Sequence, residues 1–255
     1  MKKYRIGLLA STLTSVVAFA SANAADISSG GGYKDAPYAY NWSGIYVGAN
    51  GGGGWTDPSW NFPVNSFYLN NAPKSFSSDL SGGLWGGQIG FNKQVGSIVV
   101  GVEAAGDWFS WKQTKTGPLT PSFPNDKWTT KLADLETVTL RLGYAANNWL
   151  FYGKAGPAKA TVSLSAVSGV PVPGVTYGES QRLWGIDTGA GVEYAITPNI
   201  IVGAEYNHVS IDAGVFDGRA SNGAPVAVSN KSDIELQSVV GRVSYKFGWD
   251  YMPLK

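Results

Sequence analysis

The sequence predicts an all-β fold, a closed barrel of eight antiparallel strands, and three observations lead to this prediction. Apolar and polar residues alternate with a period of two in eight segments, which is the pattern of strands with one apolar face. Short and long connections follow these segments in turn, as in an up-and-down meander. An even number of strands lets the first strand pair with the last, so that the sheet has no open edge.

The first four strands are predicted where every second residue is apolar and the residues between are mostly glycine, polar or charged. This alternation distinguishes a strand with one buried or lipid-covered face from a helix, in which apolar residues recur every three to four positions. The apolar faces contain Ile45 and Val47 in residues 43–50, Ile89 and Phe91 in 84–94, Val100 and Val102 in 98–109, and Leu140 and Leu142 in 135–145.

The last four strands are predicted on the same pattern. Pro157 interrupts the fifth strand, because proline has no N–H group to donate to a neighbouring strand. The apolar faces contain Phe151 in residues 149–160, Ile186 and Val192 in 183–195, Ile200 and Val202 in 200–209, and Val239 and Val243 in 236–247.

The connections between these strands are predicted to alternate in length, so that short turns lie on one rim and long loops on the other. Three turns are short, at residues 95–97, 146–148 and 197–199. The long loops are residues 56–80, 111–130, 161–182 and 211–233. The four glycines 51–54 are expected to open the first long loop, since they lack the lysine and the following helix of a phosphate-binding loop.

The composition restricts the classes of function. The chain has no cysteine, which excludes a disulfide framework, a Cys-ligated metal site and a thiol nucleophile. A net charge of +1 excludes the broad basic surface that binds nucleic acid. Charged residues make up 15% of the chain, against about 25% in a typical soluble domain. Glycine, tryptophan and tyrosine replace them, which is an unusual mixture for a water-soluble enzyme.

Three features favour a barrel whose apolar face contacts lipid over a soluble barrel such as a lipocalin. Most strand glycines lie on the charged face, where they make room for long side chains in a narrow lumen. Trp184 and Tyr194 are ten residues apart, about 33 Å along a strand and roughly 25 Å in height at a tilt of about 40°. Aromatic residues of the apolar face form a predicted girdle at two levels, made of Trp85, Phe91, Trp108, Tyr144, Trp184, Tyr194, Tyr206, Tyr245 and Phe247.

The complete prediction is an eight-stranded antiparallel up-and-down transmembrane β-barrel with short periplasmic turns and long extracellular loops. A basic N-terminus, an apolar stretch and a small-x-small motif predict a signal peptide over residues 1–24, cleaved between Ala24 and Ala25. We expect a periplasmic lead-in over residues 25–41, the outer-membrane barrel over 42–247 and a short periplasmic tail over 248–255.

The predicted lumen contains five acidic and four basic residues, and their balance suggests a charge network across the barrel. One interpretation is a salt-bridged plug and the other is a gated ion path. The plug is favoured, because the interior of an eight-stranded barrel is only wide enough for side chains. The members of this network are Glu103, Asp107, Arg141, Lys154, Asp187, Glu193, Glu205, Arg242 and Lys246.

The sequence predicts no enzyme, no cofactor and no metal site. The one histidine, His208, lies on the same face as Tyr206 and is expected at the membrane interface, with no catalytic role. The loops are rich in aromatic, proline, serine and asparagine residues. These loops could bind a host surface, a sugar or haem, or they could have no specific ligand, which is the default expectation.

Several segments resemble the small OmpA-like outer-membrane β-barrel family of Gram-negative bacteria, whose members are often called outer-membrane immunogenic proteins or opacity-type porin-family proteins. The resemblance runs from about Trp42 to Phe247. The segments are W-S-G-I-Y-V-G-A-N from Trp42, G-Q-I-G-F-N from Gly87, G-V-E-A from Gly101, R-L-G-Y from Arg141, G-A-G-V-E-Y-A-I-T-P-N from Gly189, A-E-Y from Ala204 and G-R-V-S-Y-K-F from Gly241.

The resemblance implies a barrel in the outer membrane with a role in envelope integrity and with surface-exposed loops. Some members show porin-like or haem-binding behaviour, so a narrow or gated pore and a haem-binding or adhesive receptor stay open as alternatives. The implied partners are outer-membrane lipid, lipopolysaccharide and the barrel assembly machinery. The chain departs from the family by continuing for eight residues after Phe247, the expected terminal aromatic residue of the last strand.

Overall fold

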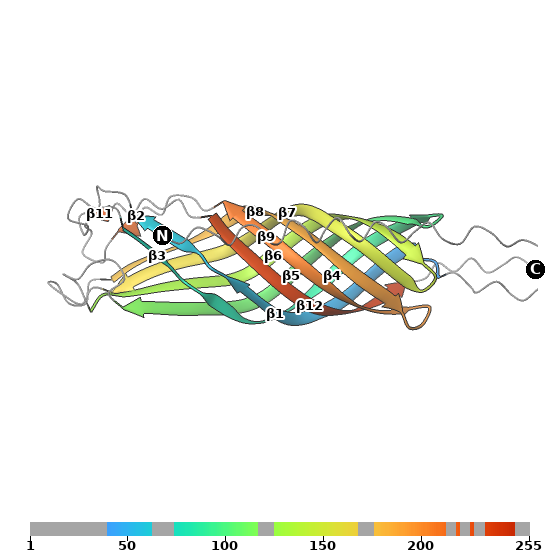
Figure 1. Ribbon diagram of the computed structural model, residues 1–255, viewed down its shortest axis with the longest axis horizontal. Coiled ribbons are helices and arrows are strands. Elements are labelled where there is room, and N and C mark those ends of the chain that lie inside the picture. The colour runs from blue at the N-terminus through green and yellow to red at the C-terminus, as the bar shows by residue number, and fades with distance from the viewer. Residues whose placement is uncertain are drawn as a thin grey trace, which may run out of the picture. The chain divides into compact units, whose positions relative to one another are not determined.

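The computed structural model describes residues 40–62, 74–116, 125–167, 176–212, 218–219, 225–226 and 233–247. Its long strands are β1 (Gly44–Thr56), β4 (Leu80–Val95), β5 (Ile98–Thr116), β6 (Lys127–Ala146), β7 (Trp149–Val167), β8 (Thr176–Ala195), β9 (Ile200–Asp212) and β12 (Asp233–Phe247). They form a closed barrel in the order β1-β12-β9-β8-β7-β6-β5-β4 (Figure 1), and every neighbouring pair is antiparallel. The prediction of an eight-stranded antiparallel barrel is confirmed.

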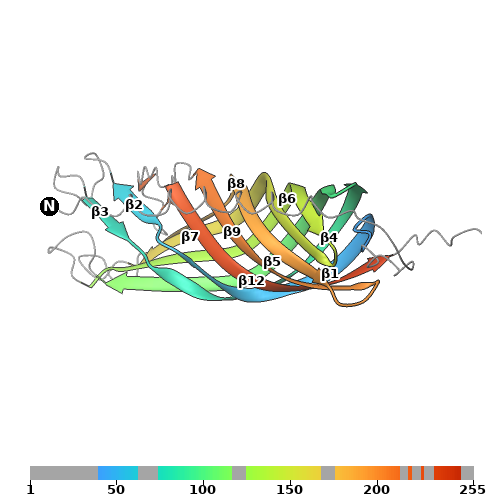
Figure 2. The same ribbon diagram turned by 45° about the vertical axis from the view of Figure 1, so that its right-hand side comes forward.

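Two small two-stranded sheets are separate from the sheet that forms the barrel. β2 (Ser59–Phe62) pairs with β3 (Lys74–Ser77), and β10 (Gly218–Arg219) pairs with β11 (Pro225–Val226). The sheet of β2 and β3 lies at the end of the barrel away from the short turns (Figure 2). Within the described ranges, no helix is long and apolar enough to cross a membrane. The predicted signal peptide, its cleavage site, most of the lead-in and the tail lie outside the described residues.

The strands are longer than the alternation predicted, so parts of the predicted long loops are strand instead. β5 and β7 have 19 residues each, and β6 and β8 have 20 each. The four glycines 51–54 belong to β1 and pair with both β4 and β12, so the prediction that they open a loop is wrong. A Cβ atom at Gly52 would lie 2.0 Å from the carbonyl oxygen of Val239, and glycine at this position therefore allows the close approach of β1 and β12.

The polarity of the barrel wall inverts along its length. In the half that carries the short turns, the outer face is apolar and exposed, as at Leu140 and Leu142, while the inner face is polar. In the other half, apolar side chains such as Trp111, Leu132 and Leu236 are buried inside. Hydroxyl and lysine side chains cover the outside there. The lipid-facing band therefore occupies only the first half, and the strands continue beyond it.

A bulge in β6 marks the boundary between the two halves. The pairing of β6 with β7 shifts between Ala133 and Leu135, and Asp134 has a φ of 52°. As a consequence, Leu132 and Leu135 both point into the barrel although they are three residues apart. β5 shows a second irregularity in register between Asp107 and Ser110, next to this bulge.

Candidate functional site

The charged residues of the lumen gather in one layer in the membrane-level half of the barrel. They come from six strands: Glu103 from β5, Arg141 from β6, Lys154 from β7, Asp187 and Glu193 from β8, Glu205 from β9, and Arg242 from β12. All seven are buried. Strand alternation places each of them on the inner face, so that residues far apart in the sequence meet at the barrel axis.

Two arginines and two glutamates form the centre of this layer. Arg242 contacts Glu103, and its Nε atom lies 3.6 Å from Oε1 of Glu193. Arg141 lies 2.9 Å from Oε1 of Glu193 and 3.3 Å from Oε2 of Glu103. Each guanidinium group thus bridges the same two carboxylates, a geometry that the planar arginine fork favours.

Lys154 and Glu205 extend the layer to one side. The Nζ atom of Lys154 lies 2.8 Å from Oε1 of Glu205 and 3.2 Å from Oδ2 of Asp187. Glu205 also contacts Arg242, which joins this pair to the centre. Every acid in the layer therefore has at least one basic partner, which buried charges require.

Two tyrosines complete the layer, and they were not among the predicted network residues. The hydroxyl group of Tyr46 donates to Oε2 of Glu103 over 2.7 Å, and that of Tyr152 donates to Oε2 of Glu205 over 2.6 Å. The ring of Tyr152 also lies 3.9 Å from the Cζ atom of Arg141. Strand alternation places both tyrosines on the inner face, and both are buried.

A sequence signal for these tyrosines exists in the neighbouring strands. Tyr46 is paired in register with Gly90, and Tyr152 with Gly191. A Cβ atom at Gly90 would lie 2.3 Å from the hydroxyl oxygen of Tyr46, and one at Gly191 would lie 2.4 Å from that of Tyr152. Each inward tyrosine thus extends over a glycine of the neighbouring strand, where any side chain would collide with it. A tyrosine opposite a glycine is therefore the signal, and it can be recognised once the strand register is known.

The structure places two predicted members of the network elsewhere. Lys246 lies near the short-turn rim, where it donates a hydrogen bond to the backbone carbonyl of Asn41 and lies 4.1 Å from the centroid of the Tyr40 ring. Asp107 is on the inner face of β5 beside the bulge, and its Oδ1 atom is buried without a hydrogen-bond partner. The seven ion pairs of the charged layer are formed by other residues.

Apolar clusters lie on both sides of the charged layer. On the side of the short turns, Trp42 is 1% exposed and packs in a cluster with Val99, Leu150 and Ile201. Its backbone N–H donates to Oε1 of Gln94 over 2.8 Å, which holds the residue inside the mouth of the barrel. On the other side, the larger cluster is built by residues of seven of the barrel strands and by Trp60 of β2.

The predicted girdle residues lie on the outer face in two groups. Trp85 and Trp108 are paired in register with ring centroids 5.0 Å apart, and their level is that of the bulge. Near the short turns, the ring centroids of Tyr194 and Trp149 are 4.7 Å apart. Trp149 is exposed on the outer face and was not in the predicted set. The other predicted members with an exposed outer side chain are Phe91, Tyr144, Trp184, Tyr206, Tyr245 and Phe247.

A metal site in the described ranges would need several His, Asp or Glu side chains close together. No set of three or more His, Asp and Glu side chains there is placed to hold a metal ion. His208 is half-buried on β9, in register with Gln237 of β12 and Thr188 of β8. The contacts that hold the charged layer are ion pairs and hydrogen bonds between its carboxylates, basic groups and tyrosines.

The family profile, the relatives and the solved structure that follow are all described as outer membrane proteins. The profile of a family described as "Outer membrane protein beta-barrel domain" matches residues 10–247. The chain is 32% identical over 157 residues to a 22 kDa outer membrane protein of Rhizobium leguminosarum bv. viciae, an alignment that covers 59% of this chain and 66% of that protein, just under two thirds. It is 32% identical over 177 residues to the 31 kDa outer-membrane immunogenic protein of Brucella melitensis biotype 1, which covers 68% and 72%. Among solved structures, the outer membrane protein OprG from Pseudomonas aeruginosa aligns with a TM-score of 0.44 and 15% identity, over 82% of this chain and 98% of that one.

Proposed function

This chain belongs to the outer membrane protein beta-barrel domain family and resides in the outer membrane, and we propose that it is a structural protein of the envelope with a lumen that does not conduct ions. The family resemblance and the location predicted from the sequence are confirmed. The structural role, the absence of conduction and the absence of enzymatic activity are the parts that we propose.

One observation carries the proposal, which is the charged layer enclosed between two apolar clusters. An ion that crossed the lumen would have to separate pairs such as Arg242–Glu103 and Arg141–Glu193. It would also have to enter the cluster around Trp42 and the larger cluster around Trp111 and Leu132. The first step leaves buried charges without partners, and the second takes the ion out of water into an apolar environment. Each step costs roughly several kcal/mol.

Conductance of the purified protein in a planar bilayer tests this proposal. We expect no reproducible current steps from the wild-type barrel. Trp42→Ala opens only one of the two apolar clusters, so it should also fail to conduct. A matched control, Val243→Ala, alters the outer face and leaves the lumen unchanged. Regular steps from the wild-type protein would refute the plug and favour the gated pore.

Surface exposure of the long connections is also part of the proposal. An enzyme is not proposed, because the one histidine of the chain, His208, lies in the wall in register with Gln237 and Thr188. No observation in the described ranges favours a haem-binding or adhesive role over the structural one. Those two predictions from the sequence therefore stay predictions.

A further inference from the structure

Four basic side chains lie together on the outside of the barrel, immediately beyond the lipid-facing band. We call Lys112, Lys131, Lys159 and Arg182 the basic patch. They belong to the neighbouring strands β5, β6, β7 and β8. Lys112, Lys131 and Arg182 are exposed and Lys159 is half-buried. None of them takes part in the lumen network, and the structural role does not account for them.

The first two lysines face each other directly. Lys112 and Lys131 are register partners on β5 and β6, and both point outward. Like charges opposite one another in adjacent strands destabilise a sheet. The next outward pair along the same strands is Thr114 and Thr129, whose hydroxyl groups are 2.9 Å apart. An anion bound between the two ammonium groups would relieve their repulsion.

The other two members fix the depth of the basic patch in the membrane. Lys159 is in register with Trp184, a predicted girdle residue, and its Nζ atom lies 5.2 Å from the centroid of that ring. Arg182 comes two residues before Trp184 on β8, nearer the long connections, and is in register with Thr161. The basic patch therefore begins at the upper girdle, where the apolar band ends and headgroups begin.

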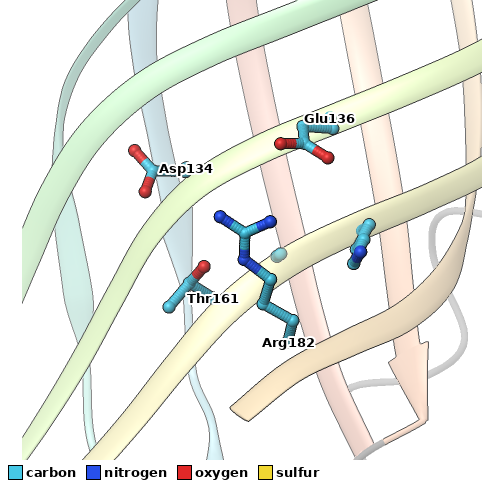
Figure 3. Close-up of a pocket in the computed structure, with 6 residues that line it drawn as sticks. Asp134, Glu136, Thr161 and Arg182 are labelled. Carbon is cyan, nitrogen blue, oxygen red and sulfur yellow. The ribbon is translucent and has the colours of Figure 1, made fainter. Parts of the chain in front are cut away.

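A small surface pocket lies next to the β6 bulge, and Lys159 and Arg182 of the basic patch are among the residues that line it. Figure 3 shows the guanidinium group of Arg182 directed between the carboxylates of Asp134 and Glu136. In the described ranges, Arg182 forms no ion pair with either acid. The pocket leaves about 10 Å³, the space of about one water molecule. The guanidinium group thus keeps donors available to a ligand above the surface.

The inner face behind the basic patch prevents its lysines from turning inward. Trp111, Trp128 and Leu132 occupy the interior next to Lys112 and Lys131, and they are packed in the larger apolar cluster. Across the barrel on β12, the exposed outer residue at the corresponding end is Glu235. Two exposed acids of β6, Asp134 and Glu136, lie among the four basic side chains, and Glu136 is the register partner of Lys159. The side of β5 to β8 still has an excess of basic groups at this level, which argues for an anionic ligand that approaches from that side.

We propose that the basic patch binds the phosphate groups of lipopolysaccharide in the outer leaflet of the outer membrane. This inference deepens the proposed function and rests on the outer-membrane location, with the long connections outside. Basic residues at the membrane surface attract anionic lipid, and each lysine or arginine contributes a similar amount to the binding free energy. Arg182 and the Lys112–Lys131 pair supply three such residues at headgroup level, and Lys159 supplies a fourth at the girdle.

A binding titration with purified protein in detergent tests the proposal. The probe is rough-type lipopolysaccharide, beside the same material after removal of its phosphates. We expect the wild-type protein to bind the phosphorylated form more tightly. The triple variant Lys112→Ala, Lys131→Ala, Arg182→Ala should lose affinity by a factor on the order of 100. Lys93→Ala, which removes an exposed lysine of β4 near the other rim, should change affinity by less than about twofold.

Three results would overturn the proposal. They are equal binding of the dephosphorylated lipid, wild-type affinity in the triple variant, and an equal loss of affinity in the Lys93→Ala control. Inorganic phosphate serves as a further arm, because tight binding of the free anion with no preference for the lipid would assign the basic patch to a soluble ligand instead.

A charge reversal at Lys131 separates binding from folding. Lys131→Glu places an acid opposite Lys112, so in lipid-free detergent the thermal unfolding midpoint should rise or stay unchanged. Its affinity for phosphorylated lipopolysaccharide should nevertheless fall at least tenfold. Unchanged affinity in this folded variant would contradict the proposal. Lys131 lies on the outer face, so this titration does not depend on whether the lumen conducts. Current steps from the wild-type barrel would refute the proposed function, whereas unchanged affinity of Lys131→Glu would refute only the lipopolysaccharide site.

Discussion

At the scale of single residues, the lumen network ties the barrel together from strand to strand. Each of the seven ion pairs joins two different strands, and Arg242 alone connects β12 to β5, β8 and β9. A barrel with another strand order would leave some of these buried charges without partners, at a large cost. We therefore expect the main effect of the network to be the selection of this one strand arrangement. Its net contribution to the free energy of unfolding is expected to be smaller.

Arg242→Leu tests this view. The substitution leaves the buried carboxylates of Glu103 and Glu205 short of a partner, so the free energy of unfolding should fall by about 3–5 kcal/mol. Denaturant titration of the refolded barrel in lipid vesicles measures the change. Tyr46→Phe removes only one hydroxyl group from Glu103 and should cost about 1–2 kcal/mol. An Arg242→Leu variant as stable as the wild type would show that the network contributes little to folding.

At the scale of elements, β1 shows why strand length was underestimated. The sequence predicts a loop at its glycines 51–54, because glycine is depleted in strands and common in turns. The barrel instead uses them where β1 passes between β4 and β12. The predicted fourth strand, which corresponds to β6, is also shorter than the observed one. Its predicted start at residue 135 is the site of the bulge, where the period of two breaks, and β6 in fact begins at Lys127.

Gly52→Ala and Gly53→Ala form a matched pair for this element. Gly52 faces inward, where a Cβ atom would meet the backbone of Val239, whereas at Gly53 the nearest atom would be 3.7 Å away. Gly52→Ala should destabilise the barrel by about 1–3 kcal/mol, because β1 must move from β12. Gly53→Ala should stay near the wild type. The heat-modified mobility of the barrel in electrophoresis measures the folded fraction, and equal behaviour of the two variants would argue against the close approach.

At the scale of the whole molecule, the inversion of wall polarity sets how deep the barrel lies in the membrane. Lipid can cover only the half with the apolar outer face, which ends at the girdle residues Trp85, Trp108 and Trp184. Beyond that level the wall has the polarity of a soluble barrel, with an apolar interior and a hydroxyl-rich exterior. The extended half thereby raises the basic patch and the small sheets above the hydrocarbon.

Assembly of the whole barrel gives a further prediction. Phe247 is the last residue of β12, its ring lies 5.1 Å from that of Tyr245, and both are exposed on the outer face. We expect deletion of residues 248–255 to leave insertion into the outer membrane intact, and Phe247→Ala to reduce it. The amount of folded protein in isolated outer membranes measures both. Val243→Ala, at another outward position of β12, is the control, and loss of insertion on the deletion alone would reverse the assignment.

The sequence by itself determined the strand number, the antiparallel order, the family and the face on which each charge lies. Alternation and connection length are local properties, and they can be read without knowing what a strand contacts. The tertiary structure decided which charges pair, because Glu103 and Arg242 are 139 positions apart and meet only when the sheet closes. Closure also assigned Tyr46 and Tyr152 to the network and moved Lys246 out of it. It likewise placed four basic residues of separate strands on one outer surface, because side-chain neighbours across a sheet depend on register.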